Sequence, residues 1–496
     1  MVRRPPPAPS TGRKPQTGLP PKKELRRGPR LGPHIEYLVR LSEGSLAELA
    51  AQESALRQKV LSSEPSRRDS LLAAAVPHPL TGSIRLLPAE DPQLLLDSEA
   101  LTRLDPRARA KFNPKHPAVT VCVEFLGSIS DLPALGMIPA VQSGDLFAGW
   151  VNLDQIKNLS EHKAVVRVEA LRTFAPTGGG GENGSGSANG ESSLSSGATG
   201  RGVRIAVIDL AFDFLHPALT RQGVGSDQVR ALWLHDMAVK APSVSPAGTM
   251  GRRFSADELQ AALKWYTDED PRTGLPLAIS GHFGRLSEMQ AAPDYRDLVA
   301  RHGTAVSGIA AGNGRASDGG PTLVVPGVAT EADLLFIAIG GHDETRFADS
   351  TEVLAGFQAA FEDPHVPCVA LMANSDNLGP HDGSLEGERF IDDMLLLPGR
   401  AIVLTAGNFN RSITDPQAFH AVAQLDPESG PSLPLVLKFD VGAVSPDSAE
   451  IWFQPVAEGK ATATVSIQLD GTSIGQPVEV REGEPVVLLK PNQNPD

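Results

Sequence analysis

The chain has 496 residues, of which 41% are hydrophobic and 21% are charged. This length indicates about three domains, and the apolar content is sufficient for packed cores. The formal net charge of -14 argues against a general affinity for nucleic acid.

The first 33 residues differ from the rest, with nine Lys or Arg against one Glu and frequent prolines. No apolar run of about 7 to 15 residues follows, as a secretory signal would require, and no segment has the roughly 18 apolar residues of a membrane span. Residues 1–33 are therefore predicted to be a disordered, basic, Pro-rich arm, with a docking or targeting element as the alternative. The predicted location is the cytoplasm.

The sequence predicts no cofactor and no metal site. Cys122 and Cys368 are the only cysteines, and both lie in apolar runs, which favours buried thiols over a disulfide framework. The Cys and His spacings of zinc sites are absent. The glycine-rich segment 177–186 has neither a strand before it nor Lys-Ser/Thr after it, which argues against nucleotide binding.

Two predicted regions follow the arm. Residues 34–117 mix helix-like stretches with proline-punctuated segments and are predicted to be a helical lead-in. In residues 118–174, the apolar side chains of 118–125 alternate, which is typical of a half-buried strand. Residues 153–171 then predict a helix followed by a strand, so the region 118–174 is predicted to be a β-α-β domain.

Residues 175–200 are too rich in Gly and Ser to bury anything and predict a flexible linker. Beyond the linker, apolar strands separated by helix-length segments predict a parallel α/β sheet within residues 201–429. These strands lie at 203–210, 332–339, 366–373 and 400–407. From 430 to 496, short alternating strands predict an all-β module of the sandwich type.

Three polar residues stand where the chemistry of this α/β domain is expected. Asp209 ends an apolar strand, and Asn408 follows another. His302 begins a run of small residues that would let a helix start close against the sheet. Because the carboxyl ends of parallel strands meet at one edge, these residues are expected to lie near each other. An acid, a base and an amide are the parts of acyl-transfer catalysis.

The order and context of these residues resemble those of the subtilisin-like serine peptidases, family S8. Asp209 with Asp213 and "HPAL" at 216–219 resembles the first family motif, and "HGTAVSGIAAG" from His302 resembles the histidine motif. "TAGN", ending at Asn408, resembles the oxyanion turn. The resemblance covers roughly residues 200–412 and implies a subtilisin-like parallel sheet with helices on both faces.

By this resemblance the protein is a serine endopeptidase acting on protein or peptide substrates. Asp209 would orient the imidazole, His302 would be the general base, and Asn408 would donate a hydrogen bond to the oxyanion. The chain departs from the family after the acid, where Leu210 and Ala211 stand in place of a hydroxyl residue and glycine. It also departs along the expected cleft, at 371–375. The alternative is a pseudoprotease that keeps the fold for binding or regulation.

The interval of 93 positions between Asp209 and His302 is long for the family and contains a capping box at Ser255 and Glu258. This insertion resembles the subgroup of the clostridial germination subtilases. Members of that subgroup also carry a jelly-roll insertion between the oxyanion asparagine and the serine. The all-β module at 430–496 falls in that position.

One serine has the spelling of the nucleophile motif, in "GTSIGQP" around Ser473. The residues after it alternate like strands, whereas the nucleophile of the family begins a helix. Ser473 is therefore predicted to lie in a hairpin turn of the all-β module. The nucleophile is expected after Asp496, so that the catalytic domain and the module are both incomplete and residues 1–496 alone are inactive.

The region 118–174 resembles a subtilase propeptide. Such a propeptide is a folding chaperone whose end enters the cleft as a product-like inhibitor, so the protein's own propeptide is an expected partner. The alternative is an independent α+β domain.

Overall fold

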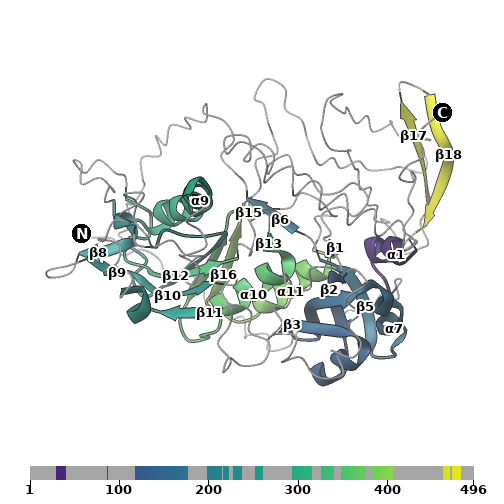
Figure 1. The fold of residues 1–496 in the computed structure, drawn as a ribbon, viewed down its shortest axis with the longest axis horizontal. Coiled ribbons are helices and arrows are strands. Elements are labelled where there is room, and N and C mark those ends of the chain that lie inside the picture. Colours follow the sequence, from purple (N-terminus) through teal and green to yellow (C-terminus); the bar gives the residue numbers. More distant parts are fainter. Residues whose placement is uncertain are drawn as a thin grey trace, which may run out of the picture.

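In a computed structural model, two folded regions and a separate hairpin are described (Figure 1). The described residues are 30–40, 86–87, 118–171, 173–176, 198–214, 216–222, 227–236, 252–260, 293–314, 326–339, 348–375, 379, 383–405, 462–469 and 472–481. Most of the predicted arm, lead-in, linker and all-β module lies outside these residues, as does Asn408. Among the described helices, none combines the length and the apolar character that crossing a membrane requires.

The first region, the N-terminal sheet domain, is an antiparallel sheet in the strand order β1-β2-β4-β3, with β5 also paired to β2. Its strands are β1 (Leu86–Leu87), β2 (Ala118–Phe125), β3 (Met137–Ser143), β4 (Leu146–Asn152) and β5 (Val165–Ala170). Its helical segments are α1 (Pro33–Arg40), η1 (Ile129–Leu135), η2 (Leu153–Gln155) and α7 (Ile156–Glu161).

The predicted β-α-β pattern of residues 118–174 is incomplete, because β3 and β4 form an additional hairpin before α7. The sequence signal for this hairpin is the two-residue turn Gly144–Asp145 between two apolar runs. Gly144 has a φ of 55°, a conformation that glycine adopts without steric cost.

Strand β2 was predicted to be half-buried, and that prediction is wrong, because all eight of its residues are buried. Val119, Val121 and Val123 point into the core of the N-terminal sheet domain, as predicted. On the opposite face, Cys122 packs in a second core that is shared with the second folded region. The outer face of β2 is therefore covered by protein.

Residues 30–40 also belong to the N-terminal sheet domain. Leu31 forms a parallel bridge with Val168, and the Gly32 N–H donates to the Val168 carbonyl at 2.8 Å. Ile35 and Leu38 of α1 are fully buried in the domain's core. The predicted division between arm and lead-in at residue 33 therefore falls inside one packed segment.

The second region, the central domain (residues 198–405), contains a six-stranded sheet in the order β11-β10-β12-β7-β14-β16. All neighbours are parallel except β11, which is antiparallel to β10. The strands are β7 (Arg204–Asp209), β10 (Ala231–Asp236), β11 (Arg252–Ser255), β12 (Asp333–Ala338), β14 (Cys368–Met372) and β16 (Arg400–Leu404). The interval between Asp209 and His302, interpreted from sequence as an insertion, thus supplies two strands of the sheet.

Helices cover both faces of this sheet, as predicted (Figure 1). Alternate residues of β7 pack into the cores on the two faces of the sheet. Val207 packs in the core that contains the end of α9 (Pro293–Ala311). Ala206 and Ile208 pack in the core that contains residues of α10 (Ser350–Ala360) and α11 (Glu386–Met394). That second core also contains Cys122 and its neighbours, so the N-terminal sheet domain rests on the α10 and α11 side.

Three smaller sheets complete the described structure. Strand β6 (Thr173–Pro176) pairs antiparallel with both β13 (Ala348–Asp349) and β15 (Asn374–Ser375). The predicted linker, which was placed from residue 175, therefore begins as a strand. Strands β8 (Thr220–Gln222) and β9 (Asp227–Val229) form a hairpin after η3 (Pro217–Leu219). Strands β17 (Thr462–Leu469) and β18 (Thr472–Arg481) form a hairpin in the region predicted to be all-β.

Candidate active site

Asp209 and His302 are in direct contact at the carboxyl end of β7. The Asp209 side chain is fully buried, and its Oδ2 lies 2.8 Å from His302 Nδ1. The second carboxylate oxygen, Oδ1, accepts a hydrogen bond from the Leu210 N–H at 2.7 Å. Leu210, although unusual for the family at this position, thus supports the carboxylate through its backbone.

His302 lies inside a helix and not at its start, which corrects the sequence prediction. The helix α9 begins at Pro293, nine residues earlier. Proline is favourable in the first turn of a helix, where its missing N–H has no intrahelical acceptor. The His302 side chain remains 22% exposed, so the imidazole is accessible from one side while Asp209 is sealed behind it.

Gly303 allows α9 to approach the end of β7 closely. A Cβ atom at this position would overlap the Ala211 carbonyl oxygen and lie 3.0 Å from both Asp209 Cβ and Phe212 Cδ1. A larger residue would therefore push the helix away from the carboxylate. This is the physical reason for a small residue directly after the histidine, as the sequence analysis expected.

Two hydroxyl side chains of α9 form hydrogen bonds here, one to the loop after β7 and one within the helix. The Asp213 N–H donates to Thr304 Oγ1 at 2.8 Å, which ties the loop after β7 to the helix. The buried Ser307 hydroxyl donates to the Gly303 carbonyl at 2.7 Å. Neither Thr304 nor Ser307 was predicted as a site residue, although both lie in the histidine motif.

The carboxyl end of α9 is held by Arg230, which was not predicted from the sequence either. Arg230 is buried, and its guanidinium donates to the carbonyl oxygens of Ala311 and, at 2.8 Å, of Ala332. A cation is favourable at the carboxyl end of a helix, where the carbonyl dipoles point outward. Burial lowers the pKa of Arg230 to about 10. Asn313 adds a tie from the residues after the helix to the Pro217 carbonyl at 2.9 Å.

Ser473 is not at the start of a helix. It lies in strand β18, opposite Gln468 of β17, and thus next to the predicted hairpin turn and not in it. Figure 1 shows this hairpin at the end of the molecule away from α9. Asn408 lies outside the described residues, four positions after the end of β16. In the part of the chain that the structure describes, no group of three or more His, Cys, Asp or Glu residues could hold a metal ion.

A family model identifies the domain that carries this site. The model of the subtilase family, peptidase S8, matches residues 200–426. Residues 200–426 are a subtilase domain. The matched range contains Asp209, His302 and Asn408, and the α/β fold is that of the family. The resemblance to the clostridial subgroup and the jelly-roll insertion stay predictions.

Two solved structures are similar to parts of the chain. The CspB protease of Clostridium perfringens is 24% identical, with a TM-score of 0.32, over 45% of this chain and 39% of that structure. Fervidolysin from Fervidobacterium pennivorans, a keratinolytic enzyme related to subtilisin, is 16% identical, with a TM-score of 0.33, over 59% of this chain and 40% of that structure. The chain thus spans less than half of either structure. No match was found among curated proteins.

The close approach at Gly303 predicts that Gly303→Ala destabilises the subtilase domain by about 1–3 kcal/mol, the usual cost of overpacking. Gly308→Ala is the matched control, because Gly308 lies on the same helix and a Cβ there meets nothing within 4 Å. The control is expected to be neutral or slightly stabilising, since alanine is the better helix former. Thermal unfolding of the two variants measures the difference. Equal effects of both substitutions would contradict the account of α9 packing.

Proposed function

We propose that the protein is a serine endopeptidase that hydrolyses protein or peptide substrates, with Asp209 and His302 as two members of its catalytic triad. One observation carries this proposal. In a subtilase domain, a buried carboxylate at the end of a parallel strand lies 2.8 Å from an imidazole nitrogen. An Asp-His pair of this kind, aligned with a serine, is the arrangement that activates a hydroxyl for acyl transfer.

The contact with Asp209 favours one tautomer of the histidine. An ionised carboxylate can only accept hydrogen bonds, so Nδ1 of His302 carries the proton that points at Asp209 Oδ2. Nε2 is then left with its lone pair and is the atom that takes the proton from a serine hydroxyl. When the imidazole becomes positively charged, the Asp209 carboxylate stabilises it. Because Asp209 is shielded from water, this attraction is stronger than it would be in solution.

Asn408 is the proposed oxyanion donor. It follows β16, which pairs in parallel with β14, the neighbour of β7. Chain segments that leave these strands start from the same edge of the sheet, the edge where Asp209 lies. In this role the Asn408 amide donates a hydrogen bond to the substrate oxygen that becomes negatively charged during attack.

Ser473 is not the proposed nucleophile. A serine that gives its proton to His302 must come within about 3 Å of the imidazole. A residue in an extended strand of the β17–β18 hairpin lacks the helical start that presents the family's serine. Residues 1–496 by themselves are accordingly expected to show no peptidase activity.

These roles predict the outcome of labelling with a fluorophosphonate, which reacts with activated serines. In a preparation that hydrolyses casein, His302→Ala is expected to abolish both hydrolysis and labelling. The control His365→Ala removes an exposed histidine of the same domain and is expected to change neither. Ser473→Ala is also expected to be without effect.

Labelling that survives His302→Ala, or a labelled peptide that contains Ser473, would contradict these assignments. Absence of labelling and hydrolysis in every preparation would favour the pseudoprotease alternative.

We also propose that the N-terminal sheet domain, together with β6, is a propeptide. The position of β6 supports this proposal, because an extended segment lies between β13 and β15 and is antiparallel to both. Adding a strand to exposed sheet edges is a common mode of peptide binding. Strand β15 comes directly after β14, a neighbour of the strand that ends at Asp209. In this proposal β6 occupies the position of a substrate strand as a product-like inhibitor.

A propeptide of this kind predicts that the active protein is cut within residues 177–200. Segments rich in Gly and Ser are preferred sites of proteolytic nicking. Mass spectrometry of an active preparation is expected to find a new amino terminus in this range. An intact amino terminus in fully active protein would contradict the proposal, and a cut within 118–171 would contradict the domain boundary.

A further inference from the structure

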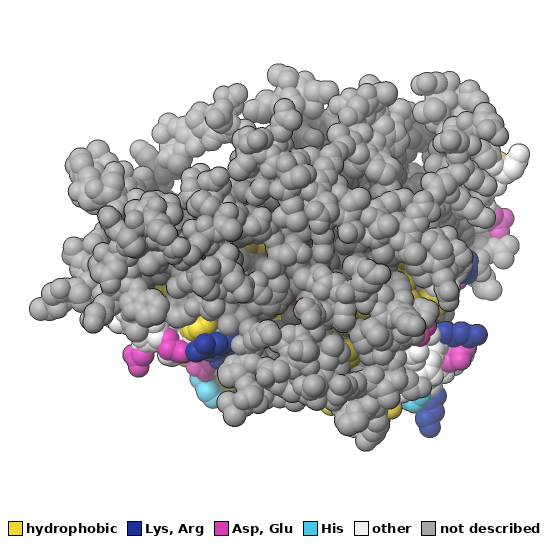
Figure 2. Space-filling view, viewed as in Figure 1, with side chains coloured by type: hydrophobic (Ala, Val, Ile, Leu, Met, Phe, Trp, Pro, Cys, Tyr) yellow, Lys and Arg dark blue, Asp and Glu magenta, His cyan; other side chains and the backbone are white. Residues whose placement is uncertain are grey.

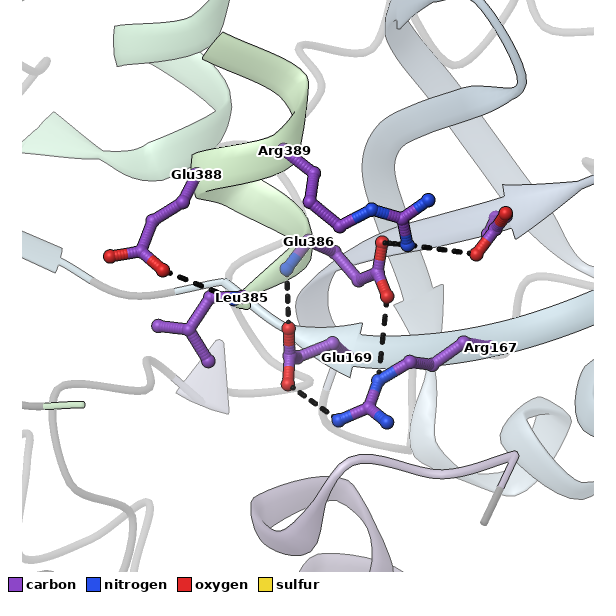
Figure 3. A network of polar contacts seen from close by, with 7 residues as sticks. Arg167, Glu169, Leu385, Glu386, Glu388 and Arg389 are labelled. Atoms are coloured by element: carbon purple, nitrogen blue, oxygen red, sulfur yellow. Dashed lines mark hydrogen bonds and ion pairs between the residues drawn. The ribbon is translucent and has the colours of Figure 1, made fainter. Parts of the chain in front are cut away.

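The interface between the N-terminal sheet domain and α11 contains a network of charged side chains whose carboxylates are buried and whose two guanidinium groups are partly exposed (Figure 3). On the surface, by contrast, basic and acidic side chains lie next to each other in water (Figure 2), and such exposed pairs contribute little to stability. The network at the interface has three carboxylates and two guanidinium groups. Its members are Glu124 of β2, Arg167 and Glu169 of β5, and Glu386 and Arg389 of α11.

Glu386 is at the centre of this network and is only 1% exposed. Its Oε2 accepts a hydrogen bond from Arg389 at 2.6 Å, and its Oε1 lies 3.4 Å from Arg167 Nε. The Glu386 backbone N–H donates to Glu169 Oε2 at 2.7 Å, across the interface. One residue of α11 is thus connected to β5 through both its side chain and its backbone.

The two remaining contacts close the network. Arg389 also donates to Glu124 Oε2 at 2.9 Å, and Arg167 lies 3.2 Å from Glu169 Oε1. Each guanidinium therefore bridges two carboxylates. With three negative and two positive groups, the network carries one negative charge in excess when all its members are ionised.

An uncompensated charge is costly at a buried site, because the water that would solvate it has been removed. Among the described residues, the further titratable groups that act on this network or on its neighbours do not correct the imbalance. They are Cys122 of β2, Asp392 and Asp393 of α11, and Asp145 in the turn between β3 and β4, none of which can be positively charged. Burial raises the pKa of the Cys122 thiol, and burial likewise raises the pKa of Asp393. A single proton on the network makes it neutral.

We propose that docking of the N-terminal sheet domain on α11 is coupled to the uptake of one proton by this network, so that the domain is held tightly in mildly acidic solution and loosened as the pH rises. Taken with the proposed function, on which this consequence rests, alkaline conditions favour release of the propeptide from the subtilase domain.

Glu386 is the group on which the proton is expected. Burial raises its pKa to about 7 from an ordinary value of 4.5, and Glu169 and Glu124 add to this effect while Arg389 and Arg167 oppose it. A pKa raised by docking means that the docked state binds protons more tightly than the separated state. The resulting stabilisation of docking is fully present below about pH 4.5 and is lost as the pH rises through about 7.

Hydrogen exchange of the complete chain tests this coupling, because the Glu386 amide is bonded across the interface to Glu169. Its exchange rate is measured by mass spectrometry between pH 6 and pH 8 and divided by the rate of an unstructured peptide of the same sequence at each pH. Protection is expected to fall by about tenfold over this range, as follows from a pKa of about 7 in the docked state. The Ile339 amide, bonded to the Asp209 carbonyl within the central sheet, serves as an internal reference and is expected to stay constant.

Two variants distinguish the effect of the Glu386 carboxylate from the effects of neighbouring groups. Glu386→Gln carries a neutral side chain of the same shape and is expected to show a protection that does not change between pH 6 and pH 8 and that is at least as high as that of the wild type at pH 6. Glu388→Gln is the matched control on the same helix, because its carboxylate accepts from the Leu385 N–H at 3.1 Å within α11 and is outside the network. The control is expected to keep the wild-type dependence on pH.

Protection in the wild type that does not change between pH 6 and pH 8 would overturn the proposal, as would a Glu386→Gln variant that keeps the tenfold change. If Glu386→Gln does not fold, the titration of the wild type still decides. Neither measurement needs peptidase activity, so a failure of the proton coupling and a failure of the proposed peptidase function are distinguishable.

Discussion

The approach of α9 to the end of β7 is the constraint on which the rest of the active site depends. A carboxylate can orient an imidazole only if the two side chains share a hydrogen bond, and here the two come from elements 93 residues apart. The absence of a side chain at Gly303 makes the distance possible. Thr304 then ties the helix to the loop after β7, and Arg230 holds the carboxyl end of the helix. The imidazole position is therefore set by packing and by hydrogen bonds to the backbone.

A second constraint is the burial of β2 on both faces. One face of the N-terminal sheet forms its own core, and the other shares a core with α10, α11 and the central sheet. This arrangement brings β6 to the strands β13 and β15 and buries the carboxylates of the charged network at α11. The apolar part of the interface is insensitive to pH, whereas the charged part is not. The proposed control of docking by protons therefore depends on a few side chains within a larger apolar contact.

The features that could be predicted from the sequence are those encoded locally. The strands β7, β12 and β14 are nearly continuous apolar runs, and such runs predict buried parallel strands. The capping box was also predicted, and the Ser255 N–H donates a hydrogen bond to Glu258 Oε2 at 2.8 Å. Asp209 and His302 could be singled out because each stands in a characteristic local context. Their contact at 2.8 Å agrees with the expectation that the helix carrying His302 lies close to the end of the strand that carries Asp209.

The features that were missed depend on contacts between distant segments. The alternation of β2 indicated one apolar face, but nothing in residues 118–125 shows that helices from residues 350–394 cover the other. Arg230 has an ordinary sequence context, and its role follows from carbonyl groups about 80 to 100 residues away. The excess charge at Glu386 likewise exists only after β2, β5 and α11 have assembled. Local patterns predict elements, whereas burial and charge balance are properties of the assembled structure.

The central claim is that Asp209 accepts a hydrogen bond from Nδ1 of His302, and proton NMR tests it directly without any need for a nucleophile. The shared proton should give a resonance far downfield of the amide region, which His302→Ala and Asp209→Ala both remove and His365→Ala leaves in place. A spectrum in which this resonance persists in Asp209→Ala, or is missing from the wild type at low temperature where exchange with water is slow, would contradict the account.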